Sequence, residues 1–242
     1  MEKKSIQILL IGLLFSFKNI SAGTTGKLSG KIIDKETGED RQANLYNLTK
    51  QTSLPTMLHE EERPRNVWIE QLALAEKIGS SDSINLIPDN FQARSDMFGL
   101  CAIVLGEDGL VWNMRILSDG PLARKYGYSD DASSKAPSKM AEIVKVIDRQ
   151  LEKQQERGSI YLIGDKISAV DIYWSTISKT ILPASLEIMP KTKQNEGMLF
   201  FFEANSKIPE IKEVLTDRIL THRDYILKTY CETPALLGGD PI

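Results

Sequence analysis

Apolar residues recur at intervals of three and four positions through much of the second half of the chain, which is the spacing of an amphipathic helix. The clearest stretch predicts a helix that ends at Arg157. Its apolar face consists of Met140, Ile143, Val144, Ile147 and Leu151. The polar residues 129–137 that precede this face predict a loop.

The last stretch of this kind predicts one helix over residues 208–230. Its apolar positions are Ile211, Leu215, Ile219 and Ile226. His222 lies at the same phase, and a single histidine on an apolar face is usually a hydrogen-bonded core residue, so we expect a structural role rather than a ligand or a base. The three adjacent phenylalanines 200–202 cannot share one helical face, so we expect at least one of them to pack in the core.

Glycine and proline mark the ends of the elements expected earlier in the chain. Residues 54–58 predict a short strand, and residues 66–78 an amphipathic helix that ends at Gly79. After a polar linker, Pro88 and Asp89 open an apolar helix. The sequence Gly-Glu-Asp-Gly at 106–109 predicts an interruption, after which the helix resumes.

The stretch from Tyr161 to Leu182 predicts a buried helix with a defined start. Ser168 stands three residues before Asp171, so the hydroxyl of Ser168 can accept the amide of Asp171 while the carboxylate of Asp171 reaches back to the amide of Ser168. This arrangement is a capping box, and Ile167 and Ile172 have the spacing of a hydrophobic staple. The residues that follow are nearly all apolar or small, which favours a helix buried on every side.

The turn Y-L-I-G-D followed by this capping box resembles the C-terminal domain of the glutathione S-transferase family. Residues 54–78 resemble the second half of the family's thioredoxin-like domain, where a cis proline precedes a strand and the strand leads into a helix. The resemblance implies a mainly α protein. Residues 88–242 would form a glutathione-transferase-like all-helical C-terminal domain, joined by the linker 81–87 to a truncated thioredoxin-like α/β remnant of residues 44–80.

The resemblance also implies a glutathione site before the first predicted helix. Pro55 would be the cis proline, and the backbone of Leu54 would pair with the cysteinyl part of glutathione. The alternative for Pro55 is an ordinary trans proline that opens an edge strand. Where the family has a Glu/Gln-Ser pair for the γ-glutamyl carboxylate, this chain has Asn66, which can donate hydrogen bonds, and Val67, which cannot. Arg65 beside them could hold the carboxylate instead.

In the family, the first helices of the C-terminal domain flank the cleft for the electrophilic substrate. Trp112 and Arg115 are therefore candidate cleft residues, and the alternative for Trp112 is a plain core position. The family commonly dimerises, which is the ground for expecting a homodimer.

The family reaction joins glutathione, as co-substrate, to a small electrophilic molecule and needs a Ser, Tyr or Cys that stabilises the thiolate. No βαβ unit that could carry such a group fits before Asn44. Two functions therefore stay open: glutathione transfer, impaired by the missing first βαβ unit, or a non-catalytic glutathione-transferase-like binding or scaffold protein.

Residues 1–23 have the pattern of a secretory signal, with Lys3 and Lys4, an apolar run of 12 residues over 6–17 and a small-residue exit. This predicts an exported or periplasmic protein. The alternative is a buried first strand or helix in a cytoplasmic protein. Residues 24–43 form a leader with one short strand. Its pattern G-x-I-x-D-x-x-T-G-E resembles the opening strand of carboxypeptidase regulatory β-sandwiches.

The composition excludes several classes of function. The chain has 242 residues, of which 41% are hydrophobic and 26% charged, the proportions of an ordinary soluble protein. A net charge of -3 without a long basic run gives no electrostatic case for nucleic acid. Cys101 and Cys231 are too few for a disulfide framework and lack metal-ligand spacing, so we expect no metal. The apolar run near the N-terminus is shorter than the roughly 20 residues of a membrane span.

Overall fold

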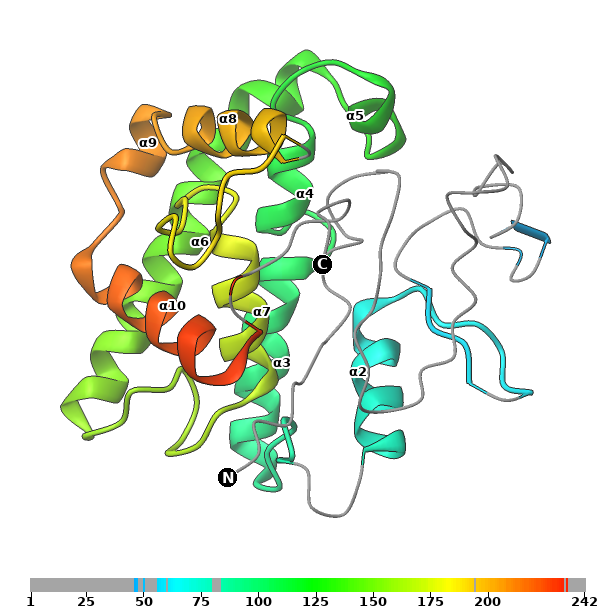
Figure 1. Ribbon diagram of the computed structural model, residues 1–242, viewed down its shortest axis with the longest axis vertical. Helices are drawn as coiled ribbons and strands as arrows, with labels where there is room; N and C mark the ends of the chain where they lie inside the picture. Colours follow the sequence, from blue (N-terminus) through cyan, green and yellow to red (C-terminus); the bar gives the residue numbers. More distant parts are fainter. Residues whose placement is uncertain are drawn as a thin grey trace.

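The structure is a computed structural model that describes residues 46, 47, 50, 56–59, 61–79, 84–193, 195–232 and 234. The predicted signal, the leader, Leu54 and Pro55 lie outside these residues. The α-helix dominates the described part, so the predicted mainly α fold is confirmed (Figure 1). The helices are α2 (Trp68–Ile78), α3 (Phe91–Leu105), α4 (Leu110–Arg115), α5 (Pro121–Lys125), α6 (Asp130–Glu156), α7 (Ala169–Ser178), α8 (Glu196–Asn205), α9 (Pro209–Lys212) and α10 (Asp217–Tyr230).

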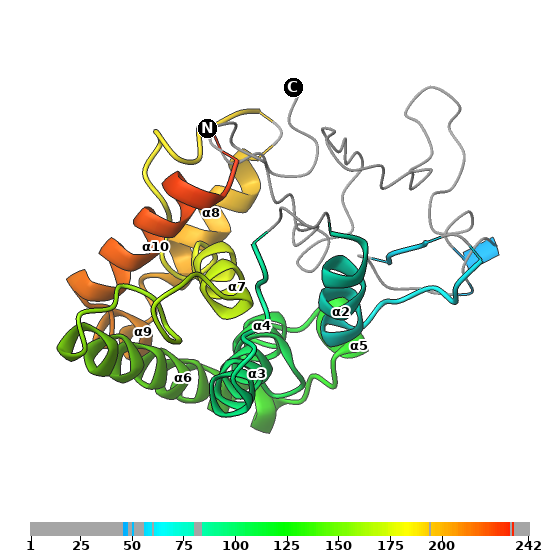
Figure 2. The same ribbon diagram turned by 90° about the horizontal axis from the view of Figure 1, so that it is seen from below.

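Helix α7 lies inside the bundle, with α3 on one side and α10 on the other (Figure 2). Every residue of α7 except Thr176 is buried, which confirms the predicted buried helix. Helix α2 joins this core through Trp68, whose ring centroid lies 6.3 Å from those of both Phe98 and Tyr173. Phe202 of α8 is buried, as expected for at least one of its three adjacent phenylalanines, whereas Phe200 is exposed.

The predicted interruption at 106–109 is confirmed, because α3 ends just before it and α4 begins just after it. A Cβ atom on Gly106 would lie 2.6 Å from the carbonyl oxygen of Ala102, so this position requires glycine. Phe91–Arg115 as a whole is long and apolar enough for a membrane span by composition. Half of its most apolar part is buried inside the bundle.

The prediction of a loop over residues 129–137 is wrong, since α6 begins there. The hydroxyl of Ser129 accepts the amide of Ala132 at 3.1 Å and caps the helix, and two acidic residues in the first turn favour its positive end. Pro137 lies inside the helix and removes one backbone hydrogen bond. The cap and the burial of Ala136 against the core outweigh that loss.

The prediction of one continuous helix over residues 208–230 is also wrong, because the chain breaks between α9 and α10. Thr216 caps α10, with its Oγ1 accepting the amide of Ile219 at 3.3 Å. The same hydroxyl donates to Asp148 of α6 at 2.7 Å, and Arg218 donates to that carboxylate at 3.0 Å. A tertiary contact with α6 therefore sets where the last helix starts.

The carboxylate of Asp171 joins the segment before α7 to α10. The side chain is fully buried, and its Oδ2 accepts the amide of Ser168 at 2.9 Å and the hydroxyl of Ser168 at 2.8 Å. Its Oδ1 accepts the amide of Leu162 at 2.7 Å and lies 3.0 Å from Nε2 of His222. The predicted capping box and the predicted core position of His222 are both confirmed.

The end of the predicted polar linker is a packed part of the fold. Leu86 is buried, and its carbonyl oxygen accepts the amide of Ala169, the first residue of α7, at 2.8 Å. Its own amide donates to the carboxylate of Glu76 in α2 at 2.9 Å. One of the unpaired amides at the start of α7 is thereby satisfied by a residue far away in the sequence.

Two cations are buried where α7 meets α10. Lys179, directly after α7, is 6% exposed, and no hydrogen bond or ion pair within the described residues reaches its ammonium group. Arg223 donates to the carbonyl oxygen of Leu182, and its Nε donates to Asp224 at 2.7 Å. Burial lowers the pKa of Lys179 to about 8, while Cys231 opposes this shift and Arg223 adds to it.

Asp171→Ala removes the acceptor of two buried amides and the partner of His222. We expect the free energy of unfolding to fall by about 3–5 kcal/mol, because buried donors are left unpaired. Urea unfolding followed by circular dichroism measures the change. Glu187→Gln, which breaks an exposed ion pair, is the control and should cost less than about 0.5 kcal/mol. Equal losses in the two variants would contradict a central role for Asp171.

Lys179→Met should stabilise the protein in a pH-dependent way. Below the folded-state pKa of about 8, both states carry the proton, so the cost of the buried charge is fully present. Between about 8 and 10.5 the folded state loses its proton first, and this cost disappears as the pH rises. We expect a gain of roughly 1–3 kcal/mol near neutral pH that shrinks toward zero near pH 10.5.

Urea unfolding of both proteins across this pH range measures that gain. The ionisation of Cys101 is common to the two proteins and cancels in the difference, whereas that of Cys231 is coupled to Lys179, so a Cys231→Ala background is used for both proteins. A gain that does not change with pH, or a loss near neutral pH, would contradict the assignment of a buried, unpaired ammonium group at Lys179.

Candidate functional site

Arg65, predicted to hold a substrate carboxylate, lies beside the start of α2 and already holds one. Its backbone forms an antiparallel bridge with Met57, with N···O distances of 2.8 and 3.0 Å. Its guanidinium donates to the carboxylate of Glu62, which also accepts a hydrogen bond from Lys77. Nδ1 of His59 lies 3.5 Å from the same carboxylate. Hydrogen bonds from Lys77 and Arg65 lower the pKa of Glu62 to about 2, so this group is a firmly held anion.

A second nitrogen of the Arg65 guanidinium, Nη1, lies inside the protein. Nη1 is buried and has no hydrogen-bond partner in the described part of the chain. The backbone carbonyl of Arg65 accepts a hydrogen bond from Nε2 of Gln71 at 3.1 Å, which ties the residue to α2. A ligand carboxylate that used the outward edge of Arg65 would have to displace Glu62.

Of the other predicted glutathione ligands, Asn66 lies within the described residues. Val67 is the residue before α2, is 46% exposed and makes no side-chain hydrogen bond to the helix. Asn66 precedes it and is half-buried. Leu54 and Pro55 lie outside the described residues, so the cis isomer and the backbone pairing with glutathione stay predictions.

Trp112 and Arg115 of α4 are brought together by a residue that the sequence did not indicate. Tyr126 follows α5, and its ring stands nearly perpendicular to that of Trp112, with centroids 5.0 Å apart. The guanidinium carbon of Arg115 lies 4.1 Å from the centroid of the same ring. We name Trp112, Arg115 and Tyr126 the α4–α5 aromatic cluster. All three side chains are half-buried, so Trp112 is not a plain core residue.

The positive charge of Arg115 has no carboxylate partner within this cluster. Burial lowers its pKa, and the neighbouring Tyr126 opposes the shift. Its Nε is buried without a hydrogen-bond partner, and no ion pair within the described residues includes it. A cation that contacts an aromatic face and lacks a carboxylate can attract the negative charge of an aromatic ligand.

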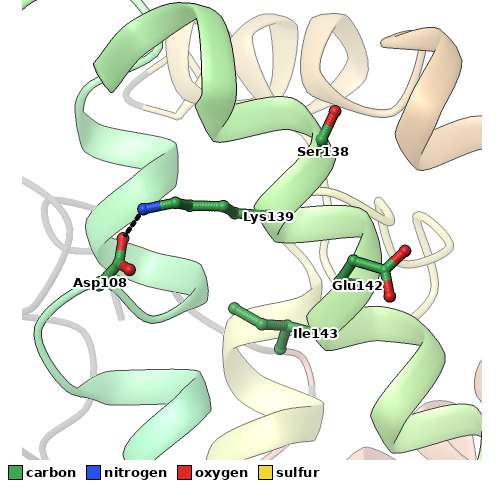
Figure 3. Close-up of a pocket in the computed structure, with 5 residues that line it drawn as sticks. All are labelled: Asp108, Ser138, Lys139, Glu142 and Ile143. Carbon is green, nitrogen blue, oxygen red and sulfur yellow. Dashed lines mark hydrogen bonds and ion pairs between the residues drawn. The ribbon is translucent and has the colours of Figure 1, made fainter. Parts of the chain in front are cut away.

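An open groove of about 330 Å³ lies between the α3–α4 turn and α6 (Figure 3). Lys139 reaches across it to Asp108, with 2.6 Å between Nζ and Oδ1, whereas Ser138 and Glu142 point away from Asp108. Ile143 supplies an apolar side chain between them. The one charged pair in the groove is satisfied and solvent-exposed, so we assign it no chemistry.

The two thiols are poor nucleophiles in this structure. Cys101 is fully buried in α3, which confirms the predicted buried free thiol, and its Sγ lies 3.6 Å from Sδ of Met97. Burial raises the pKa of both Cys101 and Cys231. Among the described residues no group of three His, Cys, Asp or Glu side chains is placed to hold a metal ion.

No protein-family model matches the chain, and no curated protein matches it. Among solved structures, the chain is similar to the GST-like domain of elongation factor 1-gamma from Saccharomyces cerevisiae. The two chains are 14% identical, with a TM-score of 0.43, and the match covers 72% of this chain and 78% of that chain.

Proposed function

We propose that this chain is a non-catalytic binding or scaffold protein with a glutathione-transferase-like helical domain. The observation that carries the proposal is the ion-pair cluster at Glu62. Arg65 is the cation available for a γ-glutamyl carboxylate. Its Nη2 already pairs with the internal carboxylate of Glu62, which Lys77 also binds. An internal carboxylate competes with the ligand at no cost in translational freedom, so it occupies the site first.

The start of α2 supports the same proposal. Helix N-termini bind anions when their amides are open and polar side chains assist them. Here the residue before α2 is Val67, whose exposed isopropyl group stands where the resemblance implies a serine hydroxyl. Ile69, the second residue of the helix, is also 41% exposed. Exposed apolar side chains beside an arginine that is already paired favour binding of a protein partner over binding of a charged tripeptide.

The test is calorimetric titration of the full chain with glutathione at millimolar concentration. We expect no binding heat from the protein as it stands. Glu62→Gln should create weak binding, because it removes the competing carboxylate and leaves Arg65 and Lys77 without their partner. Glu70→Gln, which breaks the neighbouring exposed pair with Arg63, is the matched control and should create none. Clear binding by the unchanged protein would overturn the proposal.

A second candidate function, conjugation of glutathione to a small electrophile, is favoured by the α4–α5 aromatic cluster. An aromatic electrophile could stack on Trp112 or Tyr126, with Arg115 stabilising the negative charge that develops on its ring. This candidate requires turnover of an electrophilic aryl halide above the uncatalysed rate.

If such turnover is found, Arg115→Met should lower kcat/KM by about tenfold, which corresponds to the loss of an interaction of ~1.4 kcal/mol with the transition state. Arg124→Met, which removes an exposed cation on α5, is the control and should leave kcat/KM unchanged. Initial rates with glutathione and the aryl halide measure both. An unchanged rate in Arg115→Met would exclude the cluster as the substrate cleft.

A further inference from the structure

Three tyrosines meet where the α6–α7 connection touches the end of α10. Tyr161 comes from the connection, and Tyr225 and Tyr230 come from α10. The three ring centroids are 6.2–6.5 Å apart in every pair. The hydroxyl oxygens of Tyr161 and Tyr230 lie 2.5 Å apart, so one hydroxyl donates to the other. We name these residues the tyrosine trio.

The trio is accessible from solvent. Tyr225 is 37% exposed, and Tyr161 and Tyr230 are half-buried. Burial raises the pKa of Tyr161 first, and hydrogen bonds with the other two tyrosines add to the shift. Burial likewise raises the pKa of Tyr230. Tyr161 and Tyr230 therefore carry their protons near neutral pH, so oxidation of either phenol removes a proton as well as an electron.

We propose that the tyrosine trio is an oxidative cross-linking site, at which a one-electron oxidant joins Tyr161 to Tyr230 as dityrosine. The geometry carries the proposal. In dityrosine the new bond connects the ring carbons next to the two hydroxyls, so the hydroxyls of the product lie side by side. Tyr161 and Tyr230 already have their hydroxyls in contact, and their rings are inclined by 59°. Rotation of the two side chains then brings the neighbouring ring carbons together.

The reaction balances with two equivalents of a one-electron oxidant. Each phenol gives up one electron to the oxidant and its hydroxyl proton to the solvent, which leaves two phenoxyl radicals. The radicals form one carbon–carbon bond between the ring carbons next to the hydroxyls. The hydrogen on each joined carbon then moves to the oxygen of its ring and restores the phenol. The oxidant contacts Tyr225, the most exposed ring of the trio. Tyr161 and Tyr230 then each transfer an electron to the Tyr225 radical and reduce it.

The cross-link would fasten the α6–α7 connection to the last helix. The two residues are 69 positions apart, so the bond closes a long loop in the unfolded chain and disfavours unfolding. The same two segments are held in the reduced protein by the acceptor bonds of Asp171. Oxidation would thus make permanent a contact that the fold already contains.

The test treats the full chain with photogenerated tris(bipyridine)ruthenium(III), a small one-electron oxidant, and maps the monomeric product by mass spectrometry. We expect a monomer that has lost two hydrogen masses, shows dityrosine fluorescence and yields one peptide pair joining Tyr161 to Tyr230. Its urea unfolding midpoint should be higher than that of the untreated protein. Cross-links only between molecules, or an intramolecular link outside the trio, would overturn the proposal.

Phenylalanine variants keep the rings and remove single hydroxyls. Tyr161→Phe and Tyr230→Phe should each abolish the intramolecular link and the rise in the unfolding midpoint. Tyr128→Phe is the control, because Tyr128 donates to Asp130 at 3.0 Å on the surface away from the trio, and should leave the yield unchanged. Circular dichroism confirms that each variant is folded. An undiminished yield in either Tyr161→Phe or Tyr230→Phe would show that the paired hydroxyls do not direct the coupling.

Discussion

A buried carboxylate must have its lone pairs satisfied, and this requirement at Asp171 determines how three segments assemble. Oδ2 is satisfied locally by Ser168, whereas Oδ1 needs Leu162 from the preceding turn and His222 from α10. Because an unpaired carboxylate in this position costs several kcal/mol, partly assembled arrangements are disfavoured. The position of α10 on α7 therefore depends on a buried carboxylate in a helix whose other residues are uncharged.

The same division between local and distant partners explains how much of the fold the sequence predicts. The capping box, the interruption at 106–109 and the buried character of α7 follow from neighbours along the chain, and the structure confirms each. Distant contacts contribute to both wrong boundaries. Thr216 starts α10 where Asp148 of α6 binds its hydroxyl. At the start of α6 the local cap of Ser129 is joined by a hydrogen bond from the hydroxyl of Ser133 to the carbonyl oxygen of Leu117.

The candidate site was less predictable than the fold because its contacts join residues that are distant in the sequence. A basic residue before a helix indicates a carboxylate site, but it does not reveal that Glu62 already pairs with Arg65, with Lys77 of α2 holding the same carboxylate 15 positions further on. Nor does any periodicity place Tyr126 against Trp112 and Arg115, because Tyr126 follows a short helix after Gly120 and Pro121. Charged side chains and aromatic rings form pairs between distant segments, whereas sequence spacing predicts such pairs only within one helix.

The buried acidic and basic side chains of the described residues lie in one part of the molecule. Asp171, His222, Lys179 and Arg223 all lie where α7 meets α10, and the tyrosine trio lies at the edge of that contact. Helix α2 reaches the core through the side chains of Trp68 and Leu72 and through its Glu76 carboxylate, which accepts the amide of Leu86, with no buried ion pair among these contacts. Apolar contacts respond little to protonation, whereas the buried ammonium group of Lys179 makes the α7–α10 contact depend on pH. A rise of pH through the pKa of Lys179 removes the cost of this buried charge and should therefore strengthen the attachment of α10.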